Sequence, residues 1–291
     1  MISININSHH LGGNLILEDI NLRIPDGKVL GLVGTNGSGK STLLRLMSGV
    51  YVPDSGVVLY DGKDVNIPEV RRDVFFLPDD PFYAGQTTGK SIFDTYLTFY
   101  PNLDRELYRR LLERFKLDEN AHQRNFSKGM RRQFYIAIAL SARPKYLLLD
   151  EAFDGLDAFT KKTVIEEINR AVEENDSTVV ISSHALSELE TFCDLYALID
   201  NHTVSSQGSL EEHAAKYCRF RMAFTEVQTA IAFSNLNVRD IEIKGKFVTV
   251  TIEGDADFAY SELLKLNPAV IEQEQLTFED VFITDVKGGR R

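Results

Sequence analysis

The feature that most constrains this chain is a glycine-rich stretch at residues 34–42, Gly-Thr-Asn-Gly-Ser-Gly-Lys-Ser-Thr. The apolar run at 28–33 predicts a buried strand before it, and the run at 43–47 predicts a helix that ends near Gly49. Strand, glycine loop and helix form the context in which the pattern G-x-x-x-x-G-K-[ST] holds phosphate. An ordinary glycine-rich turn is the alternative, but such a turn would not require every residue of the phosphate-binding pattern. The sequence therefore predicts a phosphate-binding loop.

This loop is expected to bind phosphate mainly through its backbone. Glycines let successive N–H groups turn toward an anion, and the start of the following helix adds partial positive charge. Lys40 is expected to reach the β- and γ-phosphates of a nucleotide, and the Ser41 hydroxyl to bind Mg²⁺. The predicted nucleotide-binding residues of the loop are Gly34, Asn36, Gly37, Ser38, Gly39, Lys40, Ser41 and Thr42.

Two carboxylates follow a second buried strand. The run at 146–149 is continuously apolar, as in a central parallel strand, and Asp150 and Glu151 come directly after it. Ligands bind at the carboxyl edge of an open parallel sheet. We expect Asp150 to hold Mg²⁺ or its water, and Glu151 to orient the attacking water as a general base. An acidic pair that only makes turn hydrogen bonds is the alternative, which the nearby phosphate loop disfavours.

A histidine lies shortly after the next predicted strand, at 178–181. His184 would lie at the same sheet edge, where it can contact the γ-phosphate and the water that Glu151 positions. A purely structural hydrogen bond is the alternative role. The predicted catalytic residues are therefore Lys40, Glu151 and His184.

Composition limits the class of protein. The 291 residues are 43% hydrophobic, enough for one large or two smaller domains. The sequence has no apolar stretch of about 18 residues and no signal-peptide pattern, so we expect a cytosolic chain without a membrane span. A net charge of −11 argues against nucleic acid as a partner. Cys193 and Cys218 fit no metal-binding spacing.

Hydrophobic patterning predicts an α/β fold with a parallel-sheet core. Period-two alternation at 1–7 and 15–24 indicates half-buried strands, and residues 88–142 have helical character. We also predict strands at 57–60, 74–77, 195–199 and 203–204. Helices are predicted at 91–100, 104–115, 129–142 and 160–174.

The composition changes after about Gly208. Strand-like stretches at 240–252, a helix at 258–266, a strand at 269–275 and a last helix at 278–286 predict a small α+β appendage over 211–291. This appendage carries no recognisable chemical motif.

Five motifs occur in an order that identifies a family. After the phosphate loop come a segment at 126–133, Phe-Ser-Lys-Gly-Met-Arg-Arg-Gln, then Asp150-Glu151, then a Gly-Leu-Asp turn at 155–157, then His184. With its motifs in this order, the stretch 1–210 resembles the ATP-binding subunit of ABC transporters. The segment at 126–133 approximates the signature of that family. The resemblance implies a P-loop NTPase fold, the ABC ATPase cassette: a RecA-like parallel-sheet core, an antiparallel β subdomain and a helical subdomain at about 88–142.

The resemblance also implies a head-to-tail pair of such subunits. Two ATP molecules, with Mg²⁺, would lie between the phosphate loop of one subunit and the signature of the other. Ser127 and the Gly129 N–H, at a helix N-terminus, would then contact a γ-phosphate, and Asp157 would belong to the same site. Lys128 replaces a glycine of the usual signature, and Arg131 and Arg132 can simply be exposed to solvent.

The chain departs from the family pattern at two further positions. Leu11, after His9 and His10, stands where the family usually has an aromatic ring that stacks on adenine. Asp79 stands where the family usually has a glutamine near the metal and the γ-phosphate. A carboxylate can also bind Mg²⁺, so Asp79 is expected to be a metal ligand along with Ser41 and Asp150.

The resemblance implies a role in transport. The Ser-x-Gly-Met signature, the Gly-Leu-Asp turn and the tail at 276–282 resemble those of bacterial exporters of drugs, antimicrobial peptides and peptide toxins, and suggest exporters of phenol-soluble-modulin type. A separately encoded integral-membrane permease would hold the subunit at the cytoplasmic face of the membrane, with Phe82 and Tyr83 expected in the docking groove. The alternatives are a soluble ABC ATPase of translation or DNA repair, and a regulator that binds nucleotide without hydrolysing it.

Overall fold

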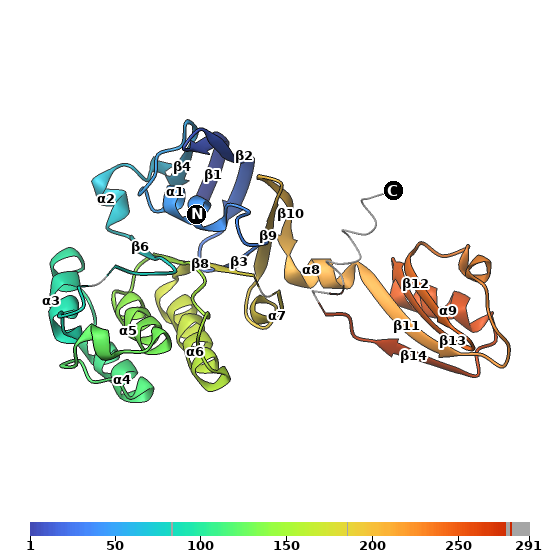
Figure 1. The fold of residues 1–291 in the computed structure, drawn as a ribbon. Coiled ribbons are helices and arrows are strands. Elements are labelled where there is room, and N and C mark those ends of the chain that lie inside the picture. The colour runs from blue at the N-terminus through green and yellow to red at the C-terminus, as the bar shows by residue number, and fades with distance from the viewer. Residues whose placement is uncertain (83, 185, 278–279, 281–291) are drawn as a thin grey trace. The chain divides into compact units, whose positions relative to one another are not determined.

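The computed structural model describes residues 1–82, 84–184, 186–277 and 280, and in it the chain forms two compact units. The first comprises Met1–Ala185 and Phe192–Gln207, and the second Leu186–Thr191 and Gly208–Arg291. The first unit contains a six-stranded sheet and the second a smaller, four-stranded one. Figure 1 shows helices next to the strands of the larger sheet. In the parts of the chain just given, no helix is long and apolar enough to cross a membrane.

The larger sheet has the strand order β10-β9-β3-β8-β7-β6. β3 pairs in parallel with β8 and β9, and β7 pairs in parallel with β8 and β6. Every residue of β3, β7 and β8 is buried, which explains their continuous apolar runs. The strands are β3 (Val29–Val33), β6 (Val74–Leu77), β7 (Tyr146–Leu149), β8 (Thr178–Ser183), β9 (Leu195–Asp200) and β10 (Thr203–Ser209).

A second sheet of the first unit has the order β2-β1-β4-β5, and its pairs are antiparallel. The strands are β1 (Ile2–Leu11), β2 (Asn14–Ile24), β4 (Ser55–Tyr60) and β5 (Lys63–Asp64). β1 runs four residues beyond the predicted end at residue 7. The register shifts between Ile6 and Ser8 and again between His9 and His10. Such irregularities break the period-two alternation, so the pattern stops before the strand does.

Helices α3, α5 and α6 of the first unit begin at capping residues that the hydrophobic pattern does not reveal. Thr88, Ser127 and Asp157 each accept a hydrogen bond from a backbone N–H of the first turn, at the starts of α3, α5 and α6. Each helix therefore begins one or two residues before its predicted start. The helices are α1 (Lys40–Met47), α2 (Pro68–Arg71), α3 (Gly89–Phe99), α4 (Arg105–Phe115), α5 (Lys128–Ser141) and α6 (Ala158–Asn175), with a 3₁₀ turn, η1 (Gln123–Asn125).

Helices α3, α4 and α5 pack together (Figure 1) around stacked aromatic rings. Phe93 lies against Tyr108, with ring centroids 4.0 Å apart, and Tyr108 contacts Phe134 edge-on at 6.3 Å. Glu167 of α6, only 3% exposed at its side chain, pairs with Arg110 and Arg114 of α4 at 2.9 Å each. Ion pairs from a buried glutamate to partly exposed arginines thus join the helical group to α6, and α6 follows β7.

The second unit is built on a sheet with the order β12-β13-β11-β14. α9 packs on β11, and Phe220, Val250 and Leu263 belong to the apolar core between them. The predicted stretch at 240–252 is two strands that turn at Gly245, whose φ is +62°. The predicted helix at 278–286 lies outside the described residues. The elements are α7 (Leu186–Leu189), α8 (Leu210–Ala215), β11 (Tyr217–Ala223), η2 (Ala230–Phe233), β12 (Val238–Lys244), β13 (Phe247–Glu253), α9 (Ala256–Leu264) and β14 (Val270–Glu274).

Candidate active site

The strand register brings most of the predicted site residues to one edge of the larger sheet. Val33 of β3 is opposite Ser183 of β8, Ile181 of β8 is opposite Leu149 of β7, and Leu149 is opposite Leu77 of β6. The carboxyl ends of four strands therefore meet, and ligands of open parallel sheets bind at such an edge. The phosphate loop, Asp79, Asp150-Glu151 and His184 follow these ends.

The loop after β3 encloses the ammonium group of Lys40. Its Nζ donates to the carbonyl oxygens of Gly34 at 2.8 Å and Thr35 at 3.3 Å, and the side chain is 5% exposed. Gly39 has φ +110°, and a Cβ there would lie 2.7 Å from Leu17 Cδ2. The loop backbone thus surrounds the ammonium group closely, and at Gly39 there is room only for glycine.

Hydroxyl groups in the loop support the fit of an anion and a cation. Ser38 Oγ is buried without a hydrogen-bond partner among the described residues, so a donor is free there for a phosphate oxygen. Ser41 Oγ donates to Asp150 Oδ1 at 3.0 Å. Asn36 and Gly37 are exposed, and Thr42 is buried in the first turn of α1.

Asp150 is fully buried, and one of its oxygens lacks a donor. Oδ1 accepts from Ser41 and from Ser182 Oγ, the latter at 2.8 Å, whereas Oδ2 has no partner in the part of the chain described. A buried carboxylate oxygen without a partner costs free energy, and a divalent cation would satisfy it. Ser41 and Asp150 therefore fit Mg²⁺.

The metal would depend on the nucleotide for further ligands. No group of three or more His, Cys, Asp or Glu side chains that could hold a metal occurs within residues 1–82, 84–184, 186–277 and 280. Mg²⁺ is commonly bound through one or two protein oxygens together with phosphates and water. The Ser41 hydroxyl and the Asp150 carboxylate at the sheet edge are two such protein oxygen donors.

Glu151 is held by contacts to both neighbouring segments. Its Oε2 is 3.0 Å from His184 Nδ1, its Oε1 is 3.3 Å from Lys40 Nζ, and its backbone N–H donates to Ser182 Oγ at 2.9 Å. Its φ of +47° is unusual for a residue with a side chain, and such strained backbone clusters at functional sites. The structure thus brings together the three predicted catalytic residues.

The signature segment lies against the Gly-Leu-Asp turn of the same chain. A Cβ on Gly129 would lie 2.7 Å from the Gly155 carbonyl oxygen. Lys128 forms an ion pair with Asp154, and this hydrogen bond raises the pKa of Lys128 and lowers the pKa of Asp154. Ser127 is exposed, and its Oγ accepts from Met130 N at 3.1 Å.

Asp157 caps a helix in this structure. Its carboxylate accepts from Thr160 N at 3.0 Å and from Thr160 Oγ1 at 2.7 Å. Both hydrogen bonds, the one from the hydroxyl above all, hold the pKa of Asp157 below its ordinary value. A contact to nucleotide would add to this capping role.

Asp79 is engaged by an arginine. Its Oδ1 is 2.6 Å from Arg132 Nη2, and the Arg132 side chain is 2% exposed. The expectation that Arg132 is a solvent-exposed residue is therefore wrong. Asp79 itself is 47% exposed at its side chain.

Leu11 is half-buried at the end of β1, opposite Asn14. His10 Nδ1 is 2.9 Å from Asp54, and His9 is buried beside Tyr51 with both ring nitrogens unpartnered among the described residues. The carboxylate of Asp54 accepts from the His10 side chain and backbone, which lowers the pKa of Asp54.

Sequence reasoning missed two polar residues of the site. Ser182 bridges Asp150 and Glu151, and the signal for it was a hydroxyl at the end of an otherwise apolar strand. Arg132 had no such signal, because an arginine on an amphipathic helix ordinarily faces water.

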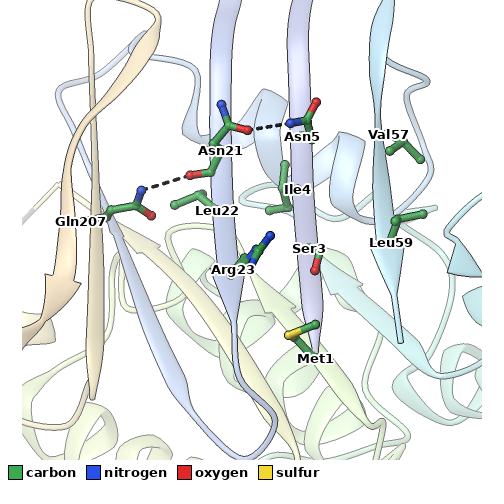
Figure 2. Close-up of a pocket in the computed structure, with 10 residues that line it drawn as sticks. All are labelled: Met1, Ser3, Ile4, Asn5, Asn21, Leu22, Arg23, Val57, Leu59 and Gln207. Atoms are coloured by element: carbon green, nitrogen blue, oxygen red, sulfur yellow. Dashed lines mark hydrogen bonds between the residues drawn. The ribbon is translucent and has the colours of Figure 1, made fainter. Parts of the chain in front are cut away.

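A hollow of about 700 Å³ lies elsewhere in the first unit, on the β2-β1-β4 sheet (Figure 2). Asn5 Nδ2 donates to Asn21 Oδ1 at 2.7 Å, and Gln207 donates to the Asn21 carbonyl oxygen at 3.1 Å. None of the predicted site residues lines it. This hollow is therefore separate from the carboxyl edge of the larger sheet.

Comparisons with known proteins identify relatives of this chain. The ABC transporter family profile matches residues 17–154. ABC transporter ATP-binding protein YtrB of Bacillus subtilis is 33% identical over 294 residues, which cover 100% of both chains. Bacitracin transport ATP-binding protein BcrA of Enterococcus faecalis is 26% identical over 96% of this chain and 94% of its own.

Solved structures share the fold. An ATP-binding cassette, solved as a dimer in a post-hydrolysis state with ADP and phosphate, has a TM-score of 0.63 to this chain. It is 22% identical, and the alignment covers 72% of this chain and 99% of that one.

Proposed function

The chain belongs to the family of ABC transporter ATP-binding proteins, and from this premise we propose that it energises a multi-subunit ABC exporter. It is an ATPase that uses ATP with Mg²⁺. The observation that supports the ATP-hydrolysing part of the proposal is the meeting of Lys40, Glu151 and His184 beside Ser41 and Asp150 at one sheet edge. In this proposal residues 1–210 form the ATP-binding domain and residues 211–291 an appended domain.

The site residues divide the work of hydrolysis. When bound, Mg²⁺ neutralises phosphate charge and polarises the γ-phosphoryl group. Lys40 and the loop N–H groups bind the phosphates, while Ser41 and Asp150 hold the metal. Glu151 accepts a proton from the attacking water at Oε1 or Oε2, and His184 keeps that carboxylate in place through its 3.0 Å contact.

Export also requires a second ATP-binding subunit. ABC ATP-binding subunits dimerise and pair with membrane permeases. In the proposed dimer, the exposed Ser127 and the N-terminus of α5 would face the γ-phosphate on the partner's loop. The packing of Gly129 against Gly155 would then join the signature to the Gly-Leu-Asp turn during dimer formation.

We place the permease contact in a groove between α2 and α3. The groove has a volume of about 510 Å³, and Arg71, Arg72, Tyr96, Phe99 and Tyr100 line it together with Pro68 and Thr95. Phe99 is 68% exposed although it is a large apolar residue, and aromatic and arginine side chains are enriched at interfaces. A short cytoplasmic helix of the permease with acidic and apolar residues fits these side chains.

The structure describes only one of the two residues expected in the docking groove, Phe82 and Tyr83. Phe82 is 94% exposed, so it is not a core residue, and Tyr83 lies outside the described residues. Phe82 remains a proposed contact of the permease.

Export of peptides, toxins or drugs is the proposed direction and cargo class. The similarity to a bacitracin transport protein extends over 96% of this chain, including the second unit, which supports this class. Through its permease the subunit would act at the cytoplasmic face of the membrane. A soluble ABC ATPase is the second candidate, and a permease-independent activity would favour it. Glu151 and His184 argue against a regulator that does not hydrolyse ATP.

The decisive experiment is co-expression with the integral-membrane permease that the proposal requires. We expect the two to co-purify, and a cargo peptide to stimulate ATP hydrolysis in the reconstituted complex. Phe99→Ala should weaken co-purification and uncouple stimulation, while Phe247→Ala, an exposed phenylalanine of β13, should not. Stimulation by ribosomes or DNA with no bound membrane protein would instead support the soluble alternative.

A further inference from the structure

We propose that Arg132 is a positioning residue for ATP hydrolysis. Its buried guanidinium holds the Asp79 carboxylate against α5, offsets the charge of that carboxylate near the phosphate site, and ties the end of β6 to the helix capped by Ser127.

Arg132 contacts the ends of two strands at once. Nη1 donates to the carbonyl oxygens of Pro78 at 3.0 Å and Asp150 at 3.4 Å. Nη2 donates to the Asp79 carbonyl oxygen and to Asp79 Oδ1, the latter at 2.6 Å. Because the guanidinium is a rigid planar fork, these contacts fix the segment after β6 relative to the residue that would hold the metal.

The pair matters electrostatically because only one partner is buried. A buried guanidinium requires a nearby carboxylate, since an unpaired charge in the interior is costly. Asp79 supplies it, and its half-exposed side chain lies at the edge where a triphosphate would bind. While the pair is intact, Arg132 offsets the negative charge of Asp79 next to that triphosphate.

A second cation of α5 lies one turn earlier on the same face. Lys128 pairs with Asp154, which follows β7, whereas Arg132 pairs with Asp79, which follows β6. Residues four apart on a helix are neighbours, so α5 is attached both to the segment after β6 and to the segment after β7 that contains the metal-binding carboxylate. Through these two pairs, a shift of either segment on nucleotide binding would move the start of α5, where Ser127 and Gly129 lie.

This inference rests on the proposed function, because it assumes that nucleotide binds at the edge containing Asp150. It differs from the expectation that Asp79 is simply a metal ligand. If Asp79 binds Mg²⁺ and Arg132 has no part, removal of the guanidinium should not alter how strongly nucleotide binding depends on the metal.

The test compares Arg132→Gln, Asp79→Asn and the double variant in the full chain, using a fluorescent ATP analogue with and without Mg²⁺. We expect Arg132→Gln to weaken metal-free binding about threefold, because Asp79 is then an unpaired charge, and to change binding with Mg²⁺ much less. The double variant should restore the wild-type ratio of the two dissociation constants, since both charges are gone. Arg132→Lys, which keeps the charge without the fork, should lie between wild type and Arg132→Gln.

Arg109→Gln, on the exposed surface of α4, is the matched control for loss of one positive charge. Hydrolysis by Arg132→Gln should show a lower kcat with little change in KM. If Arg132→Gln leaves the ratio of dissociation constants unchanged, or if the double variant is no closer to wild type than the single variants, the inference is wrong. Failure of the wild-type chain to bind ATP would instead contradict the proposed function.

Discussion

Glu151 Oε2 lies 3.0 Å from His184 Nδ1, across the ends of two adjacent parallel strands. The same carboxylate contacts Lys40 through its other oxygen at 3.3 Å. A residue between a cationic group of the phosphate loop and an imidazole is well placed to hold a water molecule for attack. This geometry leads to the first prediction.

Glu151→Gln should abolish most ATP hydrolysis and leave ATP binding intact. Loss of a general base typically costs about 10²–10⁴-fold in rate, while the amide retains the size and most contacts of the side chain. The variant should accumulate as an ATP-bound dimer. Steady-state phosphate release and size-exclusion chromatography with ATP measure both effects, and turnover near that of the wild type would contradict the role of Glu151.

Gly129→Ala should disturb the signature segment. A Cβ at this position would lie 2.7 Å from the Gly155 carbonyl oxygen, so α5 or the turn has to move. Overpacking of this kind costs about 1–3 kcal/mol of unfolding free energy, more than the gain of alanine over glycine in a helix. We expect a lower urea midpoint and loss of the ATP-dependent dimer, with ATP binding by the monomer retained.

The matched control for that variant is Gly85→Ala. A Cβ at Gly85 would meet its nearest atom, Arg124 Cβ, at 3.7 Å, which is ordinary van der Waals contact. Equal loss of the dimer in both glycine variants would show that the contact with Gly155 is not the cause.

Leu11→Tyr should strengthen ATP binding. Leucine offers no ring for stacking on a purine base, and an added aromatic contact contributes about 1 kcal/mol, or roughly fivefold in affinity. The wild-type chain should accordingly bind GTP nearly as well as ATP. Competition binding with ATP and GTP tests both statements. A strong ATP preference in the wild type, unchanged in the variant, would mean that Leu11 does not contact the base.

Asp61→Asn should lower stability at neutral pH and have little effect in acid. The Lys145 side chain, followed by the N-terminal ammonium and the Tyr146 hydroxyl, holds the pKa of Asp61 well below its usual range. A carboxyl whose folded-state pKa is depressed stabilises the fold above its unfolded pKa, about 3.9, and loses that contribution as pH falls through the folded value.

The difference in urea midpoint between wild type and Asp61→Asn should therefore be full at pH 7 and at pH 5. It should shrink below about pH 4, where the unfolded chain begins to bind the proton. Because Asp61 is 47% exposed, added salt should reduce the difference at pH 7. A difference that grows in acid would contradict the assignment.

The sequence by itself determined the features that depend on neighbouring residues. The phosphate loop at 34–42, the apolar run before Asp150 and the strand before His184 are local patterns, and β6 and β7 have the predicted bounds. Parallel strands present their carboxyl ends at one edge, so the meeting of Lys40, Glu151 and His184 could be inferred from these patterns and the strand order of a known family.

Only the tertiary structure decided the contacts between residues far apart in the chain. Arg132 and Asp79 are 53 positions apart, and no local pattern reveals that an arginine on α5 turns inward to two strand ends. Ser182 likewise meets Asp150 and Glu151 from a neighbouring strand. Likewise, only the structure shows that Gly129 packs closely against the carbonyl group of Gly155. Sequence periodicity specifies which face of an element is apolar, whereas the partner of a buried polar group depends on which elements pack against it.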